Sequence, residues 1–155
     1  PEFLRNNLRV ACQVREEDIM EIEKIFMDSG VSAEIEYFFE DVPKRMSQAQ
    51  LVVSRSGASS IADISIIGRP SILIPFAAAI GDHQTANSKG LVESGAANMI
   101  TENELTPLVL ADYITKVLSS DKLASKMAKA AVSRSKPNAL AEFADMIEVI
   151  SKNGS

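Results

Sequence analysis

Two short runs of apolar residues limit the fold more than any other feature of this sequence. They are Leu-Val-Val at 51–53 and Ile-Leu-Ile at 72–74. A strand without polar alternation is buried on both faces, which is typical of a parallel sheet covered by helices. Strands are predicted at 7–14, 33–39, 51–53, 71–76 and 96–100. Helices are predicted between them at 16–29, 41–49, 59–67 and 82–94.

This alternation predicts the α/β class, with a doubly wound, Rossmann-like, mainly parallel sheet and helices on both faces. Three more helices are expected at 107–119, 121–133 and 138–152, the first capped by Thr106 and started by Pro107. A closed eightfold barrel needs about 250 residues, and the chain has 155. We therefore expect residues 1–155 to form a single domain with an open sheet.

Charge and cysteine content exclude several classes of function. The net charge is −5 and no basic run is present, which argues against duplex nucleic acid as a partner. The single cysteine, Cys12, cannot form an intrachain disulfide or a cysteine-based metal site. No apolar run approaches the roughly 20 residues of a membrane span, and the first residues lack the apolar segment of a signal peptide. A cytoplasmic location is expected.

The segment at 55–63, Arg-Ser-Gly-Ala-Ser-Ser-Ile-Ala-Asp, leads from a predicted strand into a predicted helix. Ligands of doubly wound sheets bind outside the carboxyl ends of the strands, and free N–H groups at a helix start attract anions. Gly57 and Ala58 allow close approach of a diphosphate, Ser59 and Ser60 add hydroxyl donors, and Asp63 lies one turn further along for a ribose diol. The alternative is an ordinary connection in which small residues serve packing.

A second polar segment at 77–87 should lie over the same sheet edge, because it also follows a strand. Asp82 is expected to cap the next helix, leaving His83, Gln84 and Asn87 near its start, where they suit the hydroxyls of a sugar. The alternative is a polar loop, with His83 a surface residue. At the end of another strand, one of Phe38 and Phe39 is expected in the core, while the other offers its aromatic face or backbone to a base.

Several motifs together resemble the C-terminal domain of the MurG family of bacterial glycosyltransferases, which has the GT-B fold. They are the segment at 55–63, Gly-Arg-Pro at 68–70, Pro-Phe at 75–76, Asp-His-Gln-Thr-Ala-Asn at 82–87 and Leu-Val-Glu-Ser-Gly-Ala-Ala at 91–97. The family adds N-acetylglucosamine from UDP-N-acetylglucosamine to undecaprenyl-diphospho-muramoylpentapeptide, converting lipid I to lipid II in peptidoglycan synthesis. The resemblance covers about residues 7–150.

The resemblance implies roles for particular residues. Diphosphate and ribose would be held by the segment from Ala58 to Asp63, namely Ala58, Ser59, Ser60, Ile61, Ala62 and Asp63, beside Ser56 and Gly57. Phe39 would hold the uracil through its backbone, and Gln84 would contact the sugar. No metal or other cofactor is implied. The family usually has Glu in place of Asp63 and often a bulkier apolar residue in place of Ser59.

The family's enzymes have a second, N-terminal domain that carries the acceptor site, the membrane contact and the proposed general base. That domain is expected to be missing, together with the first strand and Gly-rich loop of the C-terminal domain. The strands at 8–14 and 51–53 should then either pair directly or leave open edges. The chain alone is expected to be inactive, and the complete enzyme peripheral, on the cytoplasmic face of the inner membrane.

Three alternatives remain open at this point. The chain could belong to a related transferase that uses another UDP-sugar, with donor preference set by residues 77–87. It could be a non-catalytic partner subunit that binds a nucleotide sugar, or an α/β domain without a ligand.

Overall fold

The structure is a computed structural model that describes residues 1–135. Its strands are β1 (Arg9–Gln13), β2 (Ser32–Glu36), β3 (Val52–Ser54), β4 (Ser71–Leu73) and β5 (Ala97–Met99). Its helices are α1 (Glu2–Arg5), α2 (Ile19–Ser29), α3 (Val42–Gln48), α4 (Ala58–Ile67), α5 (His83–Glu93), α6 (Pro107–Leu118) and α7 (Asp121–Ser133), with 3₁₀ turns η1 (Glu16–Asp18) and η2 (Ile80–Asp82). The predicted α/β class is confirmed, whereas the helix predicted at 138–152 lies outside the described residues.

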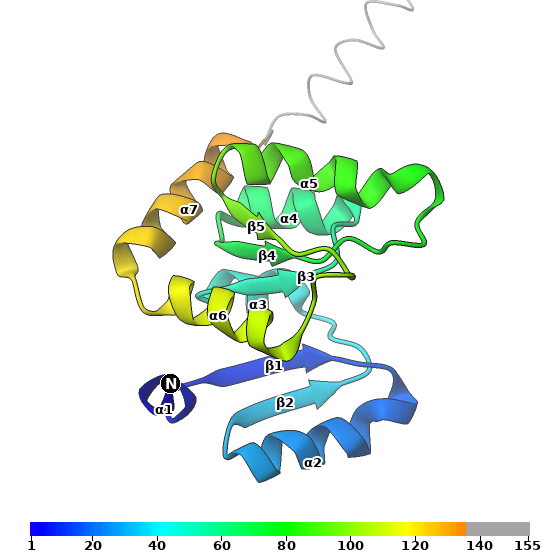
Figure 1. The fold of residues 1–155 in the computed structure, drawn as a ribbon, viewed down its shortest axis with the longest axis vertical. Helices are drawn as coiled ribbons and strands as arrows, with labels where there is room; N and C mark the ends of the chain where they lie inside the picture. Colours follow the sequence, from blue (N-terminus) through cyan, green and yellow to red (C-terminus); the bar gives the residue numbers. More distant parts are fainter. Residues whose placement is uncertain (136–155) are drawn as a thin grey trace, which may run out of the picture.

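The strands form two separate parallel sheets. One pairs β1 with β2, with Arg9 opposite Ser32, and the other has the order β3-β4-β5, with Ser71 opposite both Val52 and Ala97. In Figure 1 the loops that follow β2, β3 and β4 all leave on the right-hand side, at the carboxyl ends of the strands. This is the edge where a ligand site is expected.

β1 and β3 do not pair with each other. The sequence left two arrangements, direct pairing of these strands or open strand edges, and the structure has the open edges. Each of these strands has one ladder partner among the described strands. Figure 1 shows the β1–β2 pair lying below the three-stranded sheet, with α2 beneath it. An unpaired strand edge is a surface that another strand can join.

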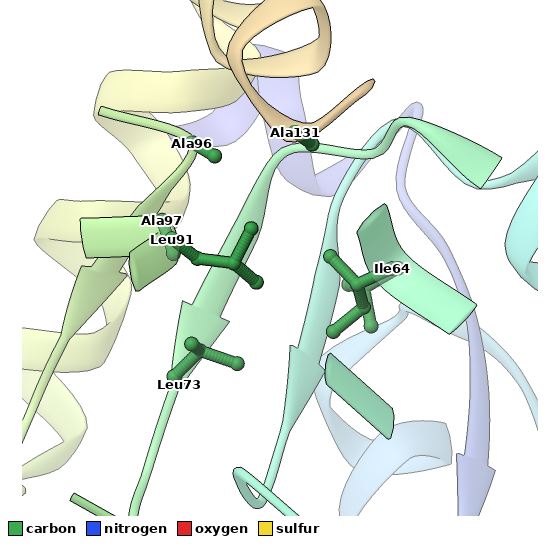
Figure 2. Close-up of a cluster of buried hydrophobic side chains, with 7 residues drawn as sticks. Ile64, Leu73, Leu91, Ala96, Ala97 and Ala131 are labelled. Carbon is green, nitrogen blue, oxygen red and sulfur yellow. The ribbon is translucent and has the colours of Figure 1, made fainter. Parts of the chain in front are cut away.

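The main core lies between the three-stranded sheet and the helices around it. Leu73 of β4, Ile64 of α4 and Leu91 of α5 are almost completely buried and point toward one another in Figure 2. Three alanines of the same cluster, Ala96, Ala97 and Ala131, let the chain approach closely. Because Ile64 sits in the middle of α4, this packing also positions the first turn of that helix.

Side-chain caps occur at the starts of α6 and α7. The Thr106 hydroxyl accepts a hydrogen bond from the N–H of Val109 (3.2 Å), and Pro107 starts α6 as predicted. Gly68 ends α4 with a positive φ of 73°, and a Cβ there would overlap the side chain of Val132. Gly68 is therefore required by both conformation and packing.

Within residues 1–135 no helix is both long and apolar enough to cross a membrane. The same residues contain no group of three or more His, Cys, Asp or Glu side chains arranged to hold a metal ion.

Candidate functional site

Helix α4 starts with free N–H groups at the carboxyl edge of the sheet. It begins at Ala58, one residue earlier than predicted, and its first internal hydrogen bond joins the Ile61 N–H to the Gly57 carbonyl (3.0 Å). No side chain caps the helix, and the N–H groups of residues 58–60 have no partner among the described residues. Such a helix start carries partial positive charge and stabilises an anion by about 0.3–1 kcal/mol.

Gly57 lies directly before this helix start and leaves space there. Its φ of −61° and ψ of 151° are accessible to any residue. A Cβ at this position would meet only the Ser60 hydroxyl oxygen, at 4.0 Å. Neither backbone conformation nor internal packing therefore requires a glycine, and the absence of a side chain leaves the first-turn N–H groups accessible.

Ser56 connects α4 to α5 instead of facing outward. Its side chain is fully buried, and its hydroxyl donates to the carbonyl oxygen of Gln84 (2.8 Å). The side-chain amide of Asn87 donates in turn to the carbonyl oxygen of Ser56 (3.1 Å). These two bonds hold the first turns of α4 and α5 side by side, as expected for segments that share one sheet edge.

Asp63 and its neighbours occupy different sides of α4. Ile61 packs against the core, and its backbone N–H and carbonyl are bonded to Gly57 and Ser65, while Ala62 is exposed. Asp63 is half-buried and makes no hydrogen bond with the described residues. It follows Ser59 by four residues and so lies one helical turn behind the free N–H groups.

The loop before α5 differs from the sequence prediction at one point. Asp82 does not cap α5: its φ is 53°, in the left-handed region, and its side chain makes no capping bond. Gly81 has a similar φ of 65°, and the His83 ring lies over it, with Nε2 3.2 Å from where a Cβ would be. Two successive left-handed residues turn the backbone so sharply that the Asp82 side chain cannot reach the first helical amides.

Gln84 has a fixed orientation at the start of α5. Its Oε1 accepts a hydrogen bond from the backbone N–H of Phe76 (3.0 Å). The Nε2 group of the same amide is therefore left as a donor.

Of the two adjacent phenylalanines, Phe38 and Phe39, one is predicted to be buried in the core, and it is Phe39. It is 8% exposed, whereas Phe38 is 60% exposed. The guanidinium of Arg45 lies over the Phe39 ring, 4.0 Å from its centroid. The same guanidinium donates to both carboxylate oxygens of Glu34 (2.7 and 2.8 Å) and to Asp41 (2.5 Å), so it holds the chain on either side of Phe39.

The ion pair predicts a specific response to acid. The hydrogen bonds from Arg45 hold the pKa of Glu34 below its ordinary value. A lowered pKa stabilises the fold above the unfolded-state value, and this contribution is lost as pH falls through the folded-state value. We expect Arg45→Met to lower the thermal midpoint at pH 7 and to flatten its decline between about pH 5 and pH 3. Thermal unfolding over this pH range is the measurement.

Arg15→Met is the matched control, because Arg15 pairs with Glu17 and Asp18 on a side chain that is 74% exposed. Exposed pairs contribute little to stability, so this variant should keep the wild-type midpoint. Equal changes in the two variants would contradict a structural role for Arg45.

Two cavities lie elsewhere in the described residues. One of about 320 Å³ is lined by residues near the start of β1, and one of about 620 Å³ lies between α2 and β2. Neither contains a residue of the candidate site, which is an open surface at the strand ends.

Sequence reasoning missed the charged side chains that hold this edge together. Arg55 pairs with Glu102, 47 residues further along, and Arg45 pairs with Glu34 on another element. No local spacing links such partners, so no motif could have identified them.

Comparisons with known proteins find relatives that match nearly the whole chain. The glycosyltransferase family 28 C-terminal domain matches residues 2–149. The UDP-N-acetylglucosamine–N-acetylmuramyl-(pentapeptide) pyrophosphoryl-undecaprenol N-acetylglucosamine transferase of Caulobacter vibrioides is 40% identical over 148 residues, which are 96% of this chain and 41% of that protein. The protein of the same name from Rhizobium etli is 41% identical, over 95% of this chain and 39% of that protein. The crystal structure of Acinetobacter baumannii MurG superposes with a TM-score of 0.84 at 29% identity, covering 91% of this chain and 43% of that one.

Proposed function

The chain belongs to the glycosyltransferase family 28 C-terminal domain family, and on this basis we propose that it is the donor-binding part of an N-acetylglucosaminyltransferase. Its donor is UDP-N-acetylglucosamine. The chain spans about 40% of the length of the curated relatives it matches. The acceptor site, the membrane contact and the general base are therefore assigned to the remainder of such an enzyme, at the cytoplasmic face of the bacterial inner membrane.

The observation that carries this proposal is the open start of α4. Its free N–H groups and the unoccupied space beside Gly57 suit a diphosphate, which is held by backbone donors and the helix dipole. Ser59 and Ser60 add hydroxyl donors on the same turn. Ser56 holds the residues before this turn in place, because its hydroxyl donates a hydrogen bond to the Gln84 carbonyl oxygen.

The remaining parts of the donor are assigned by position. Asp63 accepts hydrogen bonds from the ribose diol, and the backbone at Phe39 binds the uracil. The sugar lies against the start of α5, where Gln84 Nε2 is free to donate and His83 is exposed. Asn87 acts through Ser56, because its side-chain amide is already bonded to that carbonyl.

In the proposed reaction the 4-hydroxyl of the acceptor sugar attacks the anomeric carbon of N-acetylglucosamine. The bond from that carbon to the diphosphate oxygen breaks with inversion, and its electron pair leaves on UDP. The hydroxyl proton passes to a base in the remainder of the enzyme. The residues of this chain act on the leaving group, because the start of α4 stabilises the charge that develops on UDP without reorganising. This step converts lipid I to lipid II.

Isothermal titration with UDP tests the proposal. We expect the 155-residue chain to bind UDP and Asp63→Ala to weaken binding by about 10- to 100-fold, because charged hydrogen bonds to the ribose are lost. Asp63→Glu should retain binding, since it keeps the carboxylate.

His83→Ala and Asp112→Ala are the controls, and both should bind UDP within about twofold of wild type. His83 is assigned to the sugar, which UDP lacks, and Asp112 is an exposed residue of α6. A wild-type chain that does not bind UDP contradicts the proposal. Competition with UDP-galactose and UDP-glucose then distinguishes N-acetylglucosamine from other donor sugars.

A further inference from the structure

Arg55 and Glu102 join the loops at the ends of three neighbouring strands. Arg55 directly follows β3, and Glu102 lies in the loop after β5. One guanidinium nitrogen of Arg55, Nη1, donates to Glu102 Oε1 (2.5 Å) and to the carbonyl oxygens of Ile74 and Pro75 (3.3 Å each). The second carboxylate oxygen of Glu102 accepts from the backbone N–H of Ala77 (3.1 Å). The chain after β4 is thus held from both sides.

This pair also acts on Gln84 through Phe76. The Arg55 guanidinium lies 5.3 Å from the centroid of the Phe76 ring. The backbone N–H of Phe76, one residue before Ala77, donates to Gln84 Oε1. A shift of the chain at residues 75–77 would therefore turn the Gln84 amide and move its free donor.

The Glu102 carboxylate is suited to a permanent structural role. The hydrogen bonds from Arg55 and from the Ala77 amide hold its pKa below the ordinary glutamate value. It stays charged at neutral pH, so the contact does not open under the conditions in which the site works.

We propose that Arg55 and Glu102 are positioning residues that set the preference of the site for its sugar, by holding residues 75–77 and through them the amide of Gln84. This inference deepens the proposed function and rests on it. It assigns to Arg55 a positioning role, because its Nη1 group bonds Glu102 and two carbonyl oxygens of the chain after β4.

The test compares two ligands on the same variants. UDP uses the start of α4, whereas UDP-N-acetylglucosamine also uses Gln84. In Arg55→Gln and Glu102→Gln, titration calorimetry should show UDP affinity within about twofold of wild type. Affinity for UDP-N-acetylglucosamine should fall about five- to tenfold, the effect of one hydrogen bond. The double variant should lose less affinity than the sum of the two single losses, because both substitutions remove the same Arg55–Glu102 ion pair.

Two further variants separate positioning from general damage. Arg55→Lys should retain most of the affinity for UDP-N-acetylglucosamine, because all three contacts of Arg55 come from one nitrogen and an ammonium has three donors. Glu104→Gln removes another carboxylate from the loop after β5, one that among residues 1–135 bonds only Thr101. It should change neither affinity.

Hydrogen exchange supplies a readout that needs no ligand. The amides of Phe76 and Ala77 should exchange faster in Glu102→Gln than in wild type or Glu104→Gln, because Glu102 accepts from Ala77 directly. Unchanged exchange rates of these two amides would contradict the proposal that Glu102 holds residues 75–77.

The outcomes distinguish this inference from the proposed function. If the wild-type chain fails to bind UDP, the proposed function is wrong. If wild type binds both ligands and both Gln variants keep the wild-type ratio of affinities, only the present inference is wrong. If Arg55→Gln alone lost affinity for UDP and UDP-N-acetylglucosamine equally, Arg55 would contact the diphosphate itself. That result would also overturn the present inference.

Discussion

The Gly57→Asp variant is expected to fold as stably as the wild type and to lose UDP binding by at least about 100-fold. The backbone of Gly57 has the extended conformation of a helix-capping residue, and a Cβ fits there without contact below 4.0 Å. Aspartate at this position would accept hydrogen bonds from the free N–H groups of Ser59 or Ser60, so stability should stay within about 0.5 kcal/mol. The new carboxylate would occupy the diphosphate site and repel its charge. Titration calorimetry and urea unfolding measure the two effects.

Gly57→Asn is the matched control for charge. It caps the helix equally well and fills the same volume, so it should also fold normally. Its loss of UDP affinity should be smaller than that of Gly57→Asp, because only steric blocking remains. UDP binding that survives Gly57→Asp would place the diphosphate elsewhere and contradict the site.

The Ile64→Ala variant should lower the free energy of unfolding by about 2–5 kcal/mol. Ile64 is completely buried against Leu73 and Leu91, as Figure 2 shows, and its truncation leaves a cavity under α4. A loss of this size is a large fraction of the stability of a small domain. Urea unfolding followed by circular dichroism is the measurement.

Ile66→Ala provides the control within the same helix. Ile66 is 57% exposed, and alanine is the better helix former, so the change should stay within about 0.5 kcal/mol. If the two variants lost equal stability, α4 would not pack on the sheet as described.

Periodicity predicted most of the elements, because each depends on neighbours in the chain. The runs at 51–53 and 72–74 overlap the strands β3 and β4, and Gly30 and Gly68 end α2 and α4 with positive φ. The prediction of burial on both faces is correct for β4 but wrong for β3, where Val53 is 44% exposed. The strand predicted at 33–39 ends earlier, at Glu36, which leaves Phe39 in the loop before α3. The predicted cap at Asp82 is wrong, because the turn at residues 81–82 is set by how the loop packs and not by the residue type alone.

For the candidate site, the small residues at 56–60 already indicated an anion-binding helix start, because free N–H groups and missing side chains are local properties of the chain. The contacts around that helix start and around Phe39 are different in kind. Ser56 bonds Gln84, Arg55 bonds Glu102, and Arg45 bonds Glu34. Such partners meet only after the parallel strands have brought distant parts of the chain together. The spacing of residues along the sequence does not reveal which of them will meet. Residue types therefore predicted a ligand site at the start of α4, and the packing of the sheet established which side chains hold that helix start in place.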